Sequence, residues 1–123
     1  MKIYFAHSTA FDYQEEYYNP IHSASWSKDF ELVFPHEHNA GLYDSQGEMR
    51  SFDLVVAEVS YPSIGLGIEL GWANSIGIPI LCIYKKGTKY SSSLHAVTDN
   101  FIDYQNREDM VQNLGIYLNS IKK

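Results

Sequence analysis

Cysteine is nearly absent from this chain of 123 residues, which contains only Cys82. A single cysteine excludes an internal disulfide, and its place in the apolar run ILCIY predicts a small core residue. Long hydrophobic runs are also missing, since no stretch approaches the roughly 20 apolar residues that a membrane-spanning helix needs. The opening MKIYFAHS is too short for a secretory signal. We therefore expect a cytoplasmic protein that does not associate with a membrane.

Positive charge is scarce as well. The chain has 9 Lys and Arg against 15 Asp and Glu, which gives a net charge of −6. Duplex nucleic acid is therefore not an expected partner, because binding to its backbone needs a basic face. A single mononucleotide held by backbone amides and hydroxyls stays open. The remaining composition is that of an ordinary globular protein, and the length predicts one domain over residues 1–123.

Short apolar runs alternate with helical patterns about five times along the chain. This alternation predicts an α/β fold with a doubly wound parallel sheet of about five strands. The predicted strands are Lys2–Ala6, Glu31–Pro35, Asp53–Val59, Ile78–Lys85 and Phe101–Tyr104. The predicted helical segments are 14–21, 47–52, 63–75, 91–97 and 107–123, the last with an apolar stripe of Met110, Leu114, Tyr117 and Ile121.

The stretch SYPSIGLGIELGW, residues 60–72, carries the strongest functional pattern. Pro62 ends the preceding strand, and Ser63 is a suitable N-cap for the helix that follows. Gly65 and Gly67 leave the helix backbone bare. Ligands of open parallel sheets bind at such strand-to-helix junctions, beyond the carboxyl ends of the strands. The pattern is neither a dinucleotide fingerprint nor a Walker loop, because no Lys follows the second glycine.

Glu69 is unusual in this stretch, because its neighbours along the helix are large and apolar. A carboxylate is costly to bury without a partner or a task. Two interpretations stay open. The acid can be a first-turn residue favoured by the helix dipole, or it can lie at the floor of a pocket beside glycines that let a ligand approach.

Other polar residues are expected at the same edge of the sheet. His7, Ser8 and Thr9 follow the first strand, and we expect them to meet residues 60–63 there. Glu58 lies near the end of its strand and could face either the pocket or the layer between sheet and helices. Two acids in one pocket could divide nucleophile and acid roles, as in glycosidases. Asp53 begins its strand, at the opposite end, and is expected to be structural.

Metal and serine chemistry find little support in the pattern. His36 and His38 would project to one side of an extended segment, but nothing at suitable spacing supplies a third ligand. No G-x-S-x-G elbow exists, which argues against a serine nucleophile. Four serines fit better as hydroxyl donors to a sugar or an anionic oxygen, namely Ser8, Ser63, Ser91 and Ser92.

The segment DLVVAEVSYPSIGLGIELGWA, with YFAHS upstream and ILCIYKKGTKYSSSL downstream, resembles the nucleoside 2-deoxyribosyltransferase superfamily. The likeness is strongest to the branch of 2′-deoxynucleoside 5′-monophosphate N-glycosidases, and it extends from Met1 to about Tyr104. The resemblance implies a flavodoxin-like, Rossmann-like sheet, no cofactor, and a homodimer with shared active sites.

The resemblance also implies roles for individual residues. Glu69 is implied as the nucleophile that attacks the anomeric carbon of a 2-deoxyribosyl group, and Tyr4 as the residue that steers this carboxylate. An acid upstream binds the sugar hydroxyl or assists the leaving base. Asp44 matches that position best, with Glu48 as the alternative.

Substrate contacts are implied in the same way. Ser63 and the amides around Gly65 and Gly67 would hold a 5′ phosphate. Ser91 or Ser92 would reach into the pocket of the neighbouring subunit. His7 and Ser8 follow the first strand at the same site; His7 either contacts ligand or is satisfied by neighbouring backbone.

One departure from the family pattern concerns the phosphate. The nucleotide hydrolases carry an Arg shortly after the first strand, where this chain has Ser8-Thr9-Ala10-Phe11. The expected activity is therefore hydrolysis of the N-glycosidic bond of a deoxynucleoside 5′-monophosphate or of a plain deoxynucleoside. Three alternatives stay open: base exchange between nucleosides, cleavage of the nicotinamide bond of NAD, and nucleotide sensing without turnover.

Overall fold

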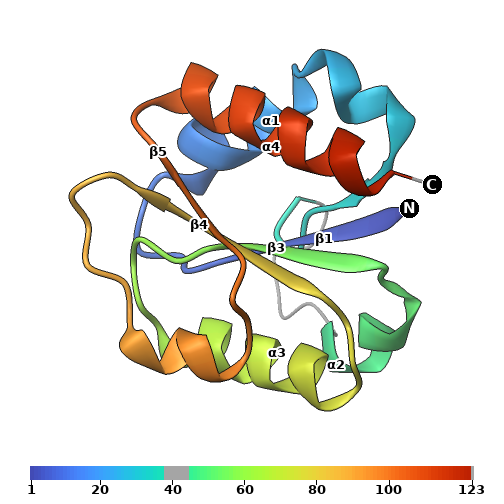
Figure 1. Cartoon of the computed structure of the whole chain (residues 1–123), viewed down its shortest axis with the longest axis vertical. Coiled ribbons are helices and arrows are strands. Elements are labelled where there is room, and N and C mark those ends of the chain that lie inside the picture. Colours follow the sequence, from blue (N-terminus) through green and yellow to red (C-terminus); the bar gives the residue numbers. More distant parts are fainter. Residues whose placement is uncertain (38–44, 123) are drawn as a thin grey trace.

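The computed structural model describes residues 1–37 and 45–122 and contains one five-stranded parallel sheet with helices on both faces (Figure 1). The strand order is β2-β1-β3-β4-β5, which is that of flavodoxin-like folds. The strands are β1 (Lys2–His7), β2 (Glu31–Val33), β3 (Leu54–Glu58), β4 (Ile80–Lys85) and β5 (Phe101–Tyr104). The predicted fold class is confirmed, and each predicted strand is present with ends that differ by up to two residues.

Helices cover the sheet in two groups (Figure 1). One face carries the π-helix η1 (Gln14–Tyr18), α1 (Asn19–His22), the 3-10 helix η2 (Ser25–Asp29) and α4 (Arg107–Ile121). The other face carries α2 (Ser45–Glu48), the 3-10 helix η3 (Met49–Ser51), α3 (Ile64–Ser75) and the 3-10 helix η4 (Ser92–Ala96). The sequence analysis did not predict η2.

Each face of the sheet has its own apolar cluster. The cluster under α1 and α4 is rich in aromatic side chains, among them the fully buried Tyr17 and Tyr18. The cluster under α3 contains Tyr4, Leu66 and Leu70. Cys82 belongs to this second cluster as a free thiol, which confirms it as a core residue, and burial raises its pKa to about 12.

The closing helix α4 packs against η2 through Trp26. The indole N–H donates to the backbone oxygen of Val111 at 3.0 Å. A Cβ at Gly115 would lie 2.7 Å from the Cδ1 atom of Trp26, so only glycine fits there without displacement. The predicted stripe is confirmed: Met110 and Leu114 are buried, and Tyr117 and Ile121 are partly buried against the same cluster, which Leu118 joins as a buried residue that the prediction omitted.

The strand register shows which residues lie at the carboxyl edge of the sheet and which lie at the opposite edge. In the pairing of β1 with β3, His7 is level with Glu58, so the segments after these strands leave the sheet side by side. Asp53 accepts a hydrogen bond from the backbone N–H of Lys2 at 2.7 Å at the opposite end, and its predicted structural role is confirmed. Within residues 1–37 and 45–122, no helix has the length and apolar character to cross a membrane.

Candidate active site

Helix α3 begins where the sequence predicts. Ser63 has an extended backbone, and its hydroxyl accepts a hydrogen bond from the N–H of Leu66 at 3.2 Å. This N-cap satisfies one of the amides that a helix leaves without an internal partner at its start. The cap fixes α3 directly beyond the end of β3, at the edge where parallel sheets bind ligands.

Two sides of α3 have different surroundings. The side formed by Leu66, Leu70 and Ala73 is buried against the sheet. Residues 65, 68, 69 and 72 follow the helical spacing of i, i+3, i+4 and i+7, and all four line a cavity. The cavity has a volume of about 410 Å³. Its lining residues are Tyr4, His7, Thr9, Pro35, His36, Ser63, Gly65, Leu66, Ile68, Glu69 and Trp72.

Glu69 and Tyr4 form the central polar contact of this cavity. The Tyr4 hydroxyl donates to Oε2 of Glu69 at 2.5 Å. Tyr4 is fully buried, and its ring stacks on Phe52 with centroids 4.8 Å apart, so the donor is rigidly placed. Glu69 itself is partly exposed to the cavity. The pocket-floor interpretation of Glu69 therefore agrees with its position, and the helix dipole alone does not account for the bond from Tyr4.

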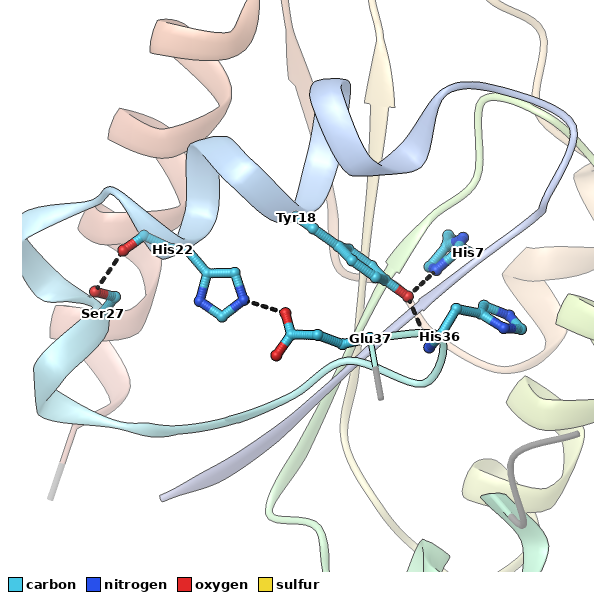
Figure 2. Close-up of polar contacts among 6 residues, drawn as sticks. All are labelled: His7, Tyr18, His22, Ser27, His36 and Glu37. Carbon is cyan, nitrogen blue, oxygen red and sulfur yellow. Dashed lines mark hydrogen bonds and ion pairs between the residues drawn. The ribbon is translucent and has the colours of Figure 1, made fainter. Parts of the chain in front are cut away.

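His7 lies at the cavity wall as a neutral imidazole. Burial lowers its pKa to about 4, an effect that its hydrogen bond to Ser8 opposes and the nearby His36 reinforces. The carbonyl oxygen of Ser8, 2.8 Å from Nδ1, can only accept, so Nδ1 carries the proton. Nε2 therefore accepts from the Tyr18 hydroxyl at 2.6 Å (Figure 2). This arrangement realises the backbone-satisfied interpretation of His7 while its ring still borders the cavity.

Glu58 does not belong to this cavity. Its carboxylate is buried and accepts from the backbone N–H of Ser60 at 2.6 Å, from the Ser60 hydroxyl at 3.0 Å and from the Tyr104 hydroxyl. Burial raises the pKa of Glu58 despite these hydrogen bonds. Glu58 therefore joins the ends of β3 and β5 and faces the protein interior, which decides the question that the sequence left open.

The remaining predicted site residues are distributed around the cavity. Ser8 is buried, and its hydroxyl accepts from the N–H of Ala10 at 3.0 Å. Gly67 and Ser91 line an adjoining cavity of about 370 Å³, which shares Ser63 and Leu66 with the first. Ser92 is exposed at the start of η4. Asp44 and His38 lie outside the described residues, and Glu48 is exposed at the end of α2.

The sequence analysis gave no binding role to several lining residues. Ile68 and Trp72 were read only as apolar neighbours of Glu69, although the helical spacing places them on its side of α3. Pro35 and His36 follow the carboxyl end of β2, and the rule that ligands bind beyond such strand ends is the signal that could have found them. Among residues 1–37 and 45–122, no group of three or more His, Cys, Asp or Glu residues could hold a metal ion.

Curated proteins match part of the chain. The mouse 5-hydroxymethyl-dUMP N-hydrolase is 43% identical over 53 residues, which are 42% of this chain and 31% of that protein. A putative 2′-deoxynucleoside 5′-phosphate N-hydrolase 1 of Syntrophotalea carbinolica is 51% identical over 41 residues, 33% of this chain and 29% of that protein. The matched part thus spans about a third of these relatives. No family model matches the chain.

Solved structures match nearly the whole chain in fold. The Clostridium botulinum CMP N-glycosidase BcmB superposes with a TM-score of 0.67 at 22% identity, covering 94% of this chain and 99% of that one. A Leishmania mexicana 2-desoxiribosyltransferase gives a TM-score of 0.68 at 20% identity and covers 99% of both chains. In sequence motif and in fold, the chain thus resembles the nucleoside 2-deoxyribosyltransferase superfamily and its nucleotide N-hydrolases, as the stretch around Glu69 predicts.

Proposed function

We propose that the protein is an enzyme that cleaves the N-glycosidic bond of a 2′-deoxynucleoside 5′-monophosphate or a deoxynucleoside. An oxygen of Glu69 attacks the anomeric carbon, the bond from that carbon to the base nitrogen breaks, and the base leaves with the bonding electrons and gains a proton. Water then attacks the same carbon and releases the sugar from Glu69. A 2-deoxy sugar suits this path, because it lacks the electron-withdrawing 2-hydroxyl and forms an oxocarbenium-like transition state readily.

The observation that carries the proposal is the Tyr4–Glu69 pair on the wall of a cavity at the carboxyl edge of the sheet. Tyr4 donates to Oε2, and the described residues provide no hydrogen bond to Oε1. One carboxylate oxygen is thus fixed while the other is available to a ligand. A carboxylate oriented in this way supplies both the nucleophile and the negative charge that stabilises the developing sugar cation.

The remaining roles extend the same proposal. Ser63 and the bare backbone at Gly65 lie at the start of α3, where they would meet the 5′ end of the substrate. Asp44 would bind the sugar hydroxyl or protonate the leaving base. In a homodimer, Ser91 or Ser92 would complete the site of the partner, and the cavity beside Ser91 offers room for that contact.

The names of the relatives favour hydrolysis, because both curated relatives described above are N-hydrolases. Base exchange uses the same covalent intermediate and differs only in whether a second base or water accepts the sugar. The two outcomes separate in one assay, since exchange requires an added free base.

The test is chromatography of the free base after incubation with the four deoxynucleoside monophosphates, their nucleosides and NAD. The proposal expects base release from deoxynucleotides or deoxynucleosides without an added acceptor, and none from NAD. Glu69→Gln should abolish the release, because the amide cannot serve as the nucleophile. Release from NAD alone, or saturable binding of deoxynucleotides with no base released at any pH, would overturn it.

A further inference from the structure

The His36 imidazole is a further polar group at the edge of the cavity. His36 is partly exposed and lines the same cavity as Glu69. Its ring lies 5.4 Å from the ring of His7 and 5.6 Å from that of Tyr13, centroid to centroid. Neither ring nitrogen forms a hydrogen bond to any residue in the described ranges 1–37 and 45–122. The ring is thus supported on its sides while its nitrogens stay available to a ligand.

The backbone of His36 is held by a chain of hydrogen bonds that ends at β1 (Figure 2). The backbone N–H of His36 donates to the Tyr18 hydroxyl at 3.2 Å, and that hydroxyl donates to Nε2 of His7. The next residue, Glu37, pairs with His22 of α1. Because burial keeps His7 neutral down to a pH of about 4, its Nε2 accepts throughout the neutral range. An aromatic hydroxyl in the core therefore fixes the position of a cavity histidine.

His36 lies at the outer level of the cavity, away from the reacting carboxylate. Along β1, His7 is three residues beyond Tyr4, a distance of about 10 Å at the rise of a strand. Along the direction of β1, Glu69 lies beside Tyr4, to which it is hydrogen-bonded, and His36 lies beside His7, which its ring contacts. On α3, Gly65 precedes Glu69 by one turn, about 6 Å, toward the same outer edge. A substrate with its anomeric carbon at Glu69 would place its 5′ end near His36.

Positive charge at that outer level is limited. The described cavity lining contains no Lys or Arg. By sequence, residues 38–44 and residues 8–11 contain no Lys or Arg. Of the two histidines that line the cavity, His7 has both ring nitrogens engaged inside the protein. Of these two histidines, His36 is therefore the one whose ring can donate to an anion, beside the hydroxyls of Thr9 and Ser63 that also line the cavity.

We infer that His36 recognises the 5′-phosphate of the substrate, donating a ring N–H to a phosphate oxygen, and that Tyr18 is the residue that positions it. The inference rests on the proposed function for the direction in which the sugar lies. It favours a deoxynucleoside 5′-monophosphate over the plain deoxynucleoside and gives the phosphate a side-chain donor in a described lining that contains no Lys or Arg. The groups beside His36 are His7 on β1, Tyr13 at the N-cap of η1 and Tyr18 on η1, and Glu69 on α3 lines the same cavity.

The kinetic test compares kcat/KM for a deoxynucleotide with that for the matching deoxynucleoside. His36→Phe keeps a ring against His7 and Tyr13 but removes the donor, so the nucleotide-to-nucleoside ratio should fall about tenfold, mainly through KM for the nucleotide. His36→Gln retains an N–H donor and should recover part of the ratio. Tyr18→Phe should lower the ratio in the same direction by a smaller factor, whereas the matched Tyr13→Phe should leave it unchanged.

A binding measurement separates this inference from the proposed reaction. Titration calorimetry with 2-deoxyribose 5-phosphate, against 2-deoxyribose as reference, needs no turnover. Weaker binding of the phosphate compound to His36→Phe supports the inference even if the wild-type protein releases no base. Equal binding to wild type and His36→Phe, no binding of the phosphate compound to wild type, or an equal loss for nucleotide and nucleoside in the kinetic assay would overturn it.

Discussion

Glu58 and Glu69 are two carboxylates that each accept a hydrogen bond from a tyrosine hydroxyl, yet their surroundings differ. Glu58 also accepts from the backbone and side chain of Ser60, and it is almost wholly buried. Glu69 accepts from Tyr4 and opens onto a cavity. A carboxylate whose oxygens are all engaged inside the protein stabilises the fold, whereas one held by a single donor beside open space is suited to chemistry.

The largest expected effect distinguishes the two acids by activity. Glu69→Gln should lower kcat/KM for base release by roughly a thousandfold or more, because the nucleophile is lost. Its free energy of unfolding should change by less than about 0.5 kcal/mol, since the side chain is partly exposed. Glu58→Gln, assayed where it is folded, is the control and should keep activity within a few-fold of wild type. Similar losses in both variants would remove the functional distinction between the two acids.

Stability should distinguish the acids in the opposite sense. Glu58→Ala leaves the Ser60 N–H and the Tyr104 hydroxyl without their acceptor inside the protein, so it should lower the free energy of unfolding by about 3 kcal/mol. Glu58→Gln keeps an acceptor oxygen and should cost less. Denaturant unfolding followed by circular dichroism measures both. A cost for Glu69→Ala as large as that for Glu58→Ala would contradict the comparison.

The two tyrosines provide a matched pair of smaller changes. Tyr4→Phe removes the donor to Glu69 but keeps the ring that stacks on Phe52. It should lower kcat by roughly 10- to 100-fold with little change in stability. Tyr104→Phe removes the corresponding donor to Glu58 and should lower the melting temperature while kcat stays near wild type. Steady-state kinetics and thermal unfolding measure both variants. A larger loss of kcat in Tyr104→Phe than in Tyr4→Phe, or a larger drop in melting temperature in Tyr4→Phe, would contradict the prediction.

The smallest expected effect is a pH dependence of stability from Glu58. Burial raises its pKa in the folded protein above the ordinary value of 4.5. The contribution to stability is therefore complete below that ordinary value and is lost as the pH rises through the folded-state pKa. The free energy of unfolding of wild type, measured relative to Glu58→Gln, should fall across this interval. A relative stability that rises over the same interval would show that the folded-state pKa is lowered instead.

The sequence predicted the fold well because its signals are local. The run at β3 is apolar throughout, and Ser63 caps α3 as its side chain suggests, so strand, turn and helix follow from short segments. The five-fold alternation of strands and helices then leaves few ways to build the sheet. In α4, Leu118 is more deeply buried than the predicted Tyr117, which packs against the same cluster, because periodicity alone does not specify how deep each side chain lies.

The candidate site was only partly predictable. Tyr4, His7, Ser63, Gly65 and Glu69 meet in one cavity as expected, since they lie at the carboxyl edge of β1 and on α3. The position of His36 on the cavity was not predicted, and its backbone is held there by a hydrogen bond to the hydroxyl of Tyr18, a residue distant in sequence. Contacts between residues that are distant in sequence leave no local pattern. For the same reason, the sequence did not predict the second cavity, which Gly67 and Ser91 line.

The central claim is that Glu69 forms a covalent bond to the sugar, and peptide mass spectrometry of the acid-quenched protein tests it most directly. The protein would be mixed with a deoxynucleotide, quenched in acid during turnover and digested, and the peptide that contains Glu69 would be examined. The account predicts an added mass of one deoxyribosyl phosphate on Glu69 in wild type and none in Glu69→Gln. Base release at full rate with no adduct in wild type, together with undiminished release by Glu69→Gln, would contradict it.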